Sequence, residues 1–537
     1  MRLNRPLSAL AGAALALTLA AGPLHAAVEL YVTDYLAPQV KTIRPLGGSP
    51  TNVARLFAAP GEYEPVSFAV RPDARVEQMF IAPTDLTGPK GRIPKENIRI
   101  QSVESYHGGD RDILMDLGGP WDMPAYRRGL FWVTVHVPDS APAGRYQGQA
   151  VVTGKGKPLA RLTLELETLP IKLEEPPFAL GYNYSSPKDA EALAAHLADM
   201  RAHGMTTVAP LYNFHLPIYD ADTSELGEFI EAYRRAGFTQ PIYFGSPMQL
   251  ISRLAGYGPV DSARFQQKFL AVMRRLHAEE RRHDTPLLFS IADELTNKGR
   301  PGIEQGALLA RLCFEELPEI AVTADMNGWL EVTTLAPWLN VATFNNGWDG
   351  IDHHNHGRRL INREFILNLQ RRTDAIPWFV NAGSGRFPFG FFFWKMAKYG
   401  VRGKVEWYYN LGDNERGSLV RAEGKTVWPT LAYERSREGV DDLKYLVTLE
   451  RLLAKARRSG RAAAAARRAE GLLARIADGI QDNWTAYAEG GETFPGDGFD
   501  VMAPSQAAGL SRYQALRRAV ADAIVDLQKA LPGPANR

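Results

Sequence analysis

The sequence predicts a multidomain fold: an N-terminal antiparallel β-sandwich, then a (β/α)8 TIM barrel, then a C-terminal helical extension. Strand-forming segments separated by Pro and Gly dominate the beginning of the chain. Short apolar strands alternate with helices in the middle, and Ala/Arg-rich helical segments follow. A chain of 537 residues is long enough for about two or three domains. We place a signal peptide at 1–26, the sandwich at 27–172, the barrel at 178–455 and the extension at 456–537.

Composition and charge narrow the class of protein. The chain is 45% hydrophobic and 23% charged, which is typical of a globular protein with a large core. Its 62 basic and 60 acidic residues give a net charge of +2. This balance argues against a general polyanion binder, so we expect no nucleic-acid partner.

The first 26 residues have the features of a secretory signal. Arg2 and Arg5 form a positive start, an Ala/Leu run follows, and "LHA" before Ala27 fits a small-x-small cleavage site. The alternative is a membrane anchor, but the apolar run is shorter than the roughly 20 residues of a spanning helix. We therefore expect an exported protein, periplasmic or secreted, with no membrane attachment after cleavage.

Cys313 is the single cysteine of the chain. An exported protein with one thiol forms no internal disulfide, so its stability depends on the size of its core. Cys313 lies in the apolar helical stretch "LLARLCFEEL", which favours a buried small hydrophobe over a nucleophile.

The sandwich is predicted from alternating or β-branched segments between Pro and Gly. These segments are 66–70, 97–106, 130–138, 145–154 and 159–169. A Gly- and Asp-rich segment, 107–124, is expected to be a loop at the rim of the barrel. The proline-containing stretch "LEEPP" (173–177) then forms a stiff linker.

The barrel is predicted from near-continuous apolar strands that alternate with helices, as in a parallel sheet covered on both faces. The eight strands are 178–184, 206–212, 241–246, 286–294, 320–328, 340–347, 376–383 and 404–410. The helices between them include 187–203, 224–236, 262–283, 303–317 and 358–373. An open doubly wound sheet is the alternative, but no glycine-rich phosphate loop opens a helix. The Ala/Arg-rich stretch after 455 is interpreted as a solvated helix face packed on the barrel.

Barrel enzymes carry their chemistry at the carboxyl ends of the strands. Those ends are rich here in Asn, Tyr and Trp, which offer hydrogen-bonding groups and apolar faces suited to a sugar. The candidate substrate-binding residues are Tyr182, Asn183, Tyr212, Asn213, Asn345, Trp348, Asn381, Trp407 and Tyr409. Arg and Lys are scarce at the same ends, so a phosphate ligand fits less well.

Two adjacent acids, Asp293 and Glu294, end the fourth strand in "LLFSIADE". Glycoside hydrolysis usually needs two carboxyl groups that flank the bond, but the seventh strand ends in Asn381. Side chains of adjacent strand residues diverge, so the pair is expected to divide its roles. This arrangement suits substrate-assisted hydrolysis, in which the 2-acetamido oxygen of the substrate attacks the anomeric carbon. Asp293 would orient the amide and Glu294 would act as general acid and base.

The sequence resembles glycoside hydrolase family 123 and its related barrel proteins of uncharacterised activity. Three stretches carry the resemblance: "FWVTVHVPDSAPAGRYQGQAVV" (131–152), "FSIADEL" (289–295) and "YERSREGVDDLKYLVTLERLL" (433–453). It spans about residues 28–455. The resemblance implies an exported β-N-acetylgalactosaminidase that works through an oxazolinium ion with neither metal nor organic cofactor. It assigns acetamido orientation to Asp293 and acid/base catalysis to Glu294.

Other functions stay open at this point. A glycosidase acting on a non-acetamido sugar, endo or exo, would need another nucleophile, with Glu406 and Asp325 as the first candidates. A non-catalytic glycan-binding barrel would bind sugar without turnover. A metal hydrolase would use the histidine cluster "DHHNH" (352–356), although no helical metal-binding spacing is present. The sequence does not determine the oligomeric state.

Overall fold

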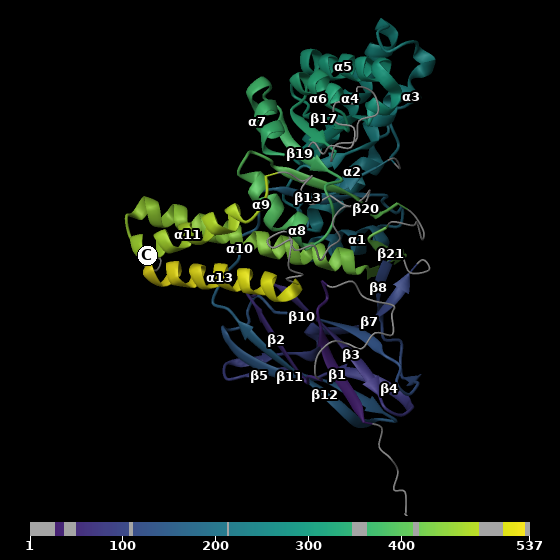
Figure 1. Ribbon diagram of the computed structural model, residues 1–537. Helices are drawn as coiled ribbons and strands as arrows, with labels where there is room; N and C mark the ends of the chain where they lie inside the picture. The colour runs from purple at the N-terminus through teal and green to yellow at the C-terminus, as the bar shows by residue number, and fades with distance from the viewer. Residues whose placement is uncertain are drawn as a thin grey trace, which may run out of the picture.

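The computed structural model describes residues 27–36, 50–106, 111–211, 214–345, 362–411, 418–482 and 509–531. Figure 1 shows the sandwich at one end, the barrel at the other, and the long C-terminal helices extending to one side between them. The predicted fold class is confirmed. The predicted signal peptide lies outside the described residues. No helix in the described ranges is long and apolar enough to cross a membrane.

The sandwich consists of two sheets whose facing sides form one apolar core. One sheet has the order β1-β3-β10-β7-β8, and the other has β2-β12-β11-β4-β9 with β5 and β6 at its side. Their bounds are β1 Val28–Thr33, β2 Val53–Ala58, β3 Tyr63–Pro72, β4 Val76–Pro83, β5 Leu86–Gly88, β6 Gly91–Ile93, β7 Ile98–Tyr106, β8 Arg111–Asp116, β9 Trp121–Met123, β10 Gly129–His136, β11 Gly144–Gly154 and β12 Lys157–Thr168. Alternate residues such as Phe68, Val133 and Leu164 face the core. Of the described pairings, β2 with β12 is parallel and the others are antiparallel.

The prediction of a rim loop at 107–124 is wrong for most of the residues that the structure describes there. Residues 111–116 form β8, which pairs with β7, and residues 121–123 form β9, which pairs with β4. Gly118 and Gly119 lie between the two strands, whereas "DILM" (112–115) has the apolar residues of a strand.

Eight parallel strands form the barrel in the predicted order. They are β13 Ala179–Tyr184, β14 Ala209–Pro210, β15 Ile242–Phe244, β16 Leu287–Asp293, β17 Val322–Met326, β18 Val341–Phe344, β19 Ile376–Val380 and β20 Gly403–Asn410. The ladder runs from β14 through β13 and β20 round to β15. Two backbone bonds close the remaining seam: Tyr243 N–H donates to Val208 O (3.1 Å) and Gly245 N–H to Pro210 O (3.0 Å). Polar groups at all the strand ends therefore meet at one mouth.

Helices cover the outside of the barrel. They are α1 Ala190–Ala202, α2 Ser224–Arg235, α3 Leu250–Arg253, α4 Ala263–His283, α5 Gly299–Glu316, α6 Trp329–Leu335, α7 Arg363–Arg372, α8 Arg386–Phe389 and α9 Phe391–Ala397. A hairpin of β21 (Val420–Glu423) and β22 (Thr426–Pro429) follows β20. The barrel interior has its own small apolar cluster, which includes Ala179, Tyr243, Leu288, Trp378 and Val405. Because strand side chains alternate, this cluster shows which residues of each strand face the barrel axis.

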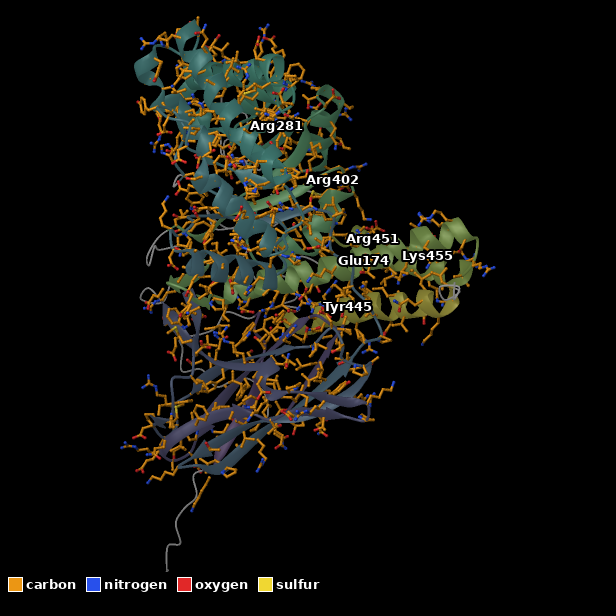
Figure 2. The ribbon with its side chains drawn as sticks, turned by 180° about the vertical axis from the view of Figure 1, so that it is seen from behind. Glu174, Arg281, Arg402, Tyr445, Arg451 and Lys455 are labelled. Carbon is orange, nitrogen blue, oxygen red and sulfur yellow. The ribbon has the colours of Figure 1, made fainter. Side chains whose placement is uncertain are left out.

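The C-terminal helices join the two domains. They are α10 Leu431–Ser459, α11 Ala463–Asp478 and α13 Gly509–Ala530. α10 and α13 pack side by side, with α13 against the sandwich (Figure 1). The linker is also fixed to α10: Thr448 Oγ1 accepts from Glu174 N–H (2.9 Å), and Arg451 bonds the Glu174 carboxylate. Figure 2 shows Glu174 and Arg451 side by side, with Tyr445 at the boundary with the sandwich.

A buried ionic cluster, here called the junction cluster, lies where the three parts meet. It consists of Arg386 from α8, Glu438 and Asp442 from α10, Arg517 from α13 and Glu64 from β3. Asp442 accepts from Arg386 Nε (2.7 Å) and Arg517 Nε (2.6 Å), so one carboxylate joins two guanidinium groups. Arg517 Nη1 also donates to Glu64 (3.1 Å) in the sandwich. The arginine side chains are 0% exposed, so every charge depends on its partners.

The cluster gives physical reasons for the motif "REGVDDLKYL" (437–446). A Cβ on Gly439 would collide with the Arg386 backbone, so glycine lets α8 lie against α10. Tyr445 O–H donates to Glu62 in the sandwich (2.7 Å). The residues that the sequence resemblance singled out here hold the domains together.

A second buried pair stabilises the start of α10. Burial alone would raise the pKa of Glu434, but Arg437 and a bond from His203 outweigh it and lower the pKa to about 2. The folded state thus favours the carboxylate. This contribution to stability is present above the ordinary pKa of 4.5 and is lost as the pH falls toward about 2.

We expect Arg517→Met to destabilise the protein by about 3–5 kcal/mol, because it leaves buried carboxylates without their cation. Arg518→Met is the matched control, since Arg518 follows on the same helix and also bonds a sandwich residue, Glu167 (2.7 Å). Arg518 is 38% exposed, so its loss should cost about 0–1 kcal/mol. Urea unfolding of both variants measures the difference. Equal losses would contradict the role of the junction cluster.

Candidate functional site

The predicted acid pair lies at the mouth of the barrel, at the carboxyl end of β16. Asp293 is the last residue of the strand and pairs with Asp325 of β17. Glu294 adopts a left-handed backbone conformation (φ 42°), and its N–H donates to Asp325 O (2.7 Å). A side chain at such a φ is uncommon and is kept only where the surroundings require it. The turn sends the chain away from the strand immediately after Asp293.

Glu294 is held by two amide side chains. Asn345 Nδ2, after β18, donates to Oε1 (3.0 Å), and Asn297 Nδ2 donates to Oε2 (2.9 Å). Burial raises the pKa of Glu294, Asp293 raises it further, and the two amide bonds oppose the shift. The net result is a half-buried carboxyl whose pKa lies above its usual range, as a general acid near neutral pH requires.

A buried glutamate that the sequence analysis missed fixes the segment after the acid pair. Glu331 of α6 accepts from Leu295 N–H (2.7 Å), Thr296 Oγ1 (2.7 Å) and Asn327 N–H (3.1 Å). It is 0% exposed. One carboxylate therefore holds the segments that follow β16 and β17 together, which makes Glu331 a positioning residue. The acid lies in an ordinary helical segment far along the chain, so the sequence carried no signal for it.

Asp325 lies inside the barrel, below the mouth. Tyr243 O–H, from β15, donates to its carboxylate. Burial raises the pKa of Asp325 well above its usual range, and Asp293 adds to the shift. The shift reflects the cost of a second buried charge under the acid pair. The burial of Asp325 does not suit the alternative role of nucleophile.

Glu406, the other alternative nucleophile, supports the backbone. It is 2% exposed and accepts from Ala382 N–H (2.6 Å), Gly383 N–H (3.0 Å) and Lys404 Nζ. These donors occupy both carboxylate oxygens. Glu406 lies on the outer side of the barrel wall, because Val405, its neighbour in β20, faces the interior. Glu406 thus shapes the end of β19.

An exposed aromatic side chain stands where β19 and β20 end. Asn381 adopts φ 53°, and its Oδ1 accepts from Trp407 N–H (3.1 Å). Trp407 is 44% exposed, which is unusual for so large an apolar group. Of the predicted substrate-binding residues, Asn345 contacts the acid pair, while Asn381 and Trp407 belong to a neighbouring part of the same mouth.

Two predicted substrate-binding tyrosines belong to the packing layer between strands and helices, contrary to expectation. Tyr182 packs against Phe389 of α8 (ring centroids 5.5 Å apart), and Tyr409 O–H donates to Asp199 of α1 (3.0 Å). Both are 0% exposed. Tyr182 faces the helices because Ala179, and with it Gly181, takes the inward positions of β13.

The remaining predicted residues are placed as follows. Asn183 is buried at the end of β13, and its Oδ1 has no hydrogen-bond partner among the described residues. Tyr212, Asn213 and Trp348, like the histidine cluster 352–356, lie outside the described residues. Within the described ranges, no group of three or more His, Cys, Asp and Glu side chains could hold a metal ion. Burial raises the pKa of Cys313 to about 12, as expected for an inert core thiol.

The fold is similar to that of a solved glycoside hydrolase. A family 123 glycoside hydrolase from Clostridium perfringens, studied for glycolipid glycan hydrolysis, matches with a TM-score of 0.58 over 89% of this chain and 93% of that chain, at 14% identity. A family 39 glycoside hydrolase from Bacteroides cellulosilyticus WH2 matches less well, with a TM-score of 0.38 over 65% of this chain and 78% of that chain, at 13% identity. The resemblance expected from the sequence is thus confirmed for the fold. No family model matches the chain. No curated protein matches it either.

We expect Glu331→Ala to loosen the segment after the acid pair, because the amides of Leu295 and Thr296 lose their acceptor. Hydrogen exchange at these two amides should accelerate at least tenfold, about 1.4 kcal/mol of lost protection. Glu315→Ala, at an exposed pair with Arg311, is the control and should leave this segment unchanged. Equal exchange in both variants would argue against the positioning role.

Proposed function

We propose that the protein is an exported glycoside hydrolase that cleaves a β-linked N-acetylhexosamine, N-acetylgalactosamine first, by substrate-assisted catalysis. One observation carries the proposal: Glu294, half-buried and with a raised pKa, lies beside Asp293 at the mouth of a barrel. The fold shared with a family 123 glycoside hydrolase supports the class of reaction. The sequence of residues 1–26 supports export.

In the first step, the carbonyl oxygen of the substrate's 2-acetamido group attacks the anomeric carbon. Asp293 accepts a hydrogen bond from the amide N–H, which orients the amide and stabilises its developing positive charge. Glu294 transfers its proton to the glycosidic oxygen as the bond to the leaving group breaks. The products are the free alcohol and an oxazolinium ion, with Glu294 left as a carboxylate.

In the second step, water attacks the anomeric carbon from the face that the leaving group vacated. Glu294 takes a proton from this water, and the ring of the oxazolinium opens to restore the acetamide. Two inversions retain the configuration of the sugar. The amides of Asn345 and Asn297 stabilise the carboxylate form of Glu294 between the two steps.

The substrate supplies the nucleophile in this scheme because the other strand-end acids of the described barrel are hydrogen-bonded to the backbone or buried. Glu406 is bonded to Lys404 and two backbone amides, and Asp325 is buried below the mouth. β19 is followed by Asn381 in place of a carboxylate. The exposed ring of Trp407 offers an apolar platform for a sugar face at the same mouth.

We expect Glu294→Gln and Asp293→Asn each to lower kcat about 10²–10⁴-fold on aryl β-N-acetylgalactosaminide. Both variants remove a group that acts in the transition state while preserving shape. Glu315→Gln, at an exposed position on α5, serves as the control for an ordinary charge change. Release of the aryl group, with aryl galactoside and glucoside in parallel, measures the effect. Equal cleavage of plain hexosides would overturn the role of the acetamido group.

We expect Asn297→Ala to move the alkaline limb of the kcat/KM profile to higher pH. Catalysis needs protonated Glu294, so the rate falls as the pH rises through the pKa of this group. The Asn297 amide lowers that pKa by stabilising the carboxylate, so its removal raises the pKa further. A limb that stays in place or moves to lower pH would show that Glu294 does not control it.

A further inference from the structure

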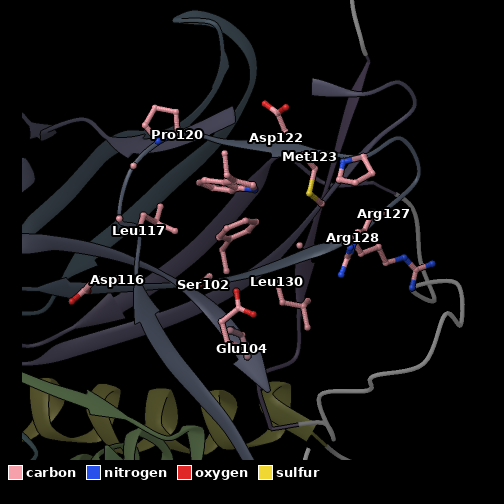
Figure 3. A pocket seen from close by; sticks show the side chains of 17 residues that line it. Ser102, Glu104, Asp116, Leu117, Pro120, Asp122, Met123, Arg127, Arg128 and Leu130 are labelled. Atoms are coloured by element: carbon pink, nitrogen blue, oxygen red, sulfur yellow. The ribbon is translucent and has the colours of Figure 1, made fainter. Parts of the chain in front are cut away.

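A cavity lies in the sandwich, outside the barrel. It has a volume of about 660 Å³ and is lined by the end of β7, the β8–β9 segment and the start of β10. Figure 3 shows Leu117 and Pro120 on one side, Met123, Arg127 and Arg128 on the other, and Glu104 at the lower edge. A volume of roughly 300–1,000 Å³ is typical of small-molecule sites.

The wall of the cavity includes an aromatic surface. Trp121 is partly exposed and packs on the buried ring of Phe131 (centroids 5.9 Å apart), which fixes the orientation of the indole. Phe131 itself belongs to the sandwich core. A rigid indole that borders a cavity offers a flat apolar face to a ligand at little entropic cost.

Some polar side chains of the cavity are already bonded to other residues, and some are not. Asp116 is bonded by Arg99 (2.8 and 2.7 Å) and Asp122 by Arg75 (2.6 Å). The side chains of Glu104 and Arg127 also line the cavity and form no hydrogen bond or ion pair with other described residues. An available carboxylate and an available guanidinium can accept from and donate to hydroxyl groups of one ligand.

The backbone next to Arg127 is strained and presents another aromatic ring. Tyr126 adopts φ 60° and is 71% exposed. Its N–H donates to Pro72 O (2.7 Å), which holds the conformation. A tyrosine at positive φ is disfavoured. Tyr126 does not itself line the cavity but adjoins the lining residue Arg127. Across the cavity, a Cβ on Gly118 or Gly119 would meet no atom within 4 Å, so the backbone there is open.

We propose that this cavity is a second carbohydrate site, which binds a neutral hexose or N-acetylhexosamine unit of a glycan. The aromatic wall would contact the C–H face of the sugar, while Glu104 and Arg127 would bond its hydroxyls. β8, which contributes Asp116 to the cavity, also contacts the start of α10, where Ile113 forms a β-bridge with Thr430, the residue that caps this helix. The choice of a sugar as ligand rests on the proposed function.

The test is calorimetric titration of the full chain carrying Glu294→Gln, which keeps the probes intact. The probes are galactose, N-acetylgalactosamine and the disaccharide of N-acetylgalactosamine β-linked to galactose. Adding Trp121→Ala should weaken binding at one site about tenfold, the equivalent of about 1.4 kcal/mol. Phe314→Ala, which removes an aromatic ring 57% exposed on α5, is the matched control and should leave the titration unchanged. Thermal unfolding checks that both variants are folded.

Sugar binding that depends on Trp121 supports the site, even if the wild type hydrolyses no glycoside, in which case the proposed function alone fails. Arg127→Met gives an independent variant, and it should weaken the same binding event. Binding of all three sugars that neither variant changes would overturn the proposal, as would the absence of sugar binding to the full chain.

Discussion

The architecture depends on one buried carboxylate that two arginines share. Asp442 bonds Arg386 from the barrel side and Arg517 from the last described helix, and Arg517 continues to Glu64 in the sandwich. Removing these charges from water is costly, and only a complete set of partners offsets that cost. A partial arrangement would bury an unpaired ion, so the sandwich, the barrel and the C-terminal helices have one favourable relative position.

Acidic residues near the strand ends take different roles because their surroundings differ. Glu331 and Glu406 face backbone amides and hold loop segments in place, and Asp325 lies inside the barrel against Tyr243. Asp293 and Glu294 are left at the mouth. Residue type is the same throughout, so burial and hydrogen-bond donors determine which acids support the backbone and which stay at the mouth. The same contrast explains why a count of strand-end carboxylates overstates the number available for catalysis.

The eight barrel strands and the acid pair were predictable because buried parallel strands form near-continuous apolar runs. The side of the strand that each residue faces was not predictable, because a one-residue shift moves every side chain to the other side. Tyr182 and Tyr409 were therefore assigned to the mouth although they pack under helices. For Tyr182, small and large residues alternate in "ALGYNY" (179–184), which indicates that Ala179 and Gly181 face the interior and the tyrosine faces the helices. The role of Glu331 depends on a hydrogen bond with Leu295, which lies 36 residues away in the sequence, so no local pattern reveals it.

The position of Arg517 in the chain has a consequence for the order of folding. A growing chain presents Glu64 first, then Arg386, Glu438 and Asp442, and only with α13 does the second guanidinium arrive. Until then Glu64 lacks the guanidinium of Arg517 that is hydrogen-bonded to it, so burying its charge is unfavourable. Contacts between α10 and the sandwich, such as the bond from Tyr445 to Glu62, can form earlier, but the junction cluster is complete only with this last helix. The ionic junction between the domains is therefore among the last contacts that can be completed during synthesis.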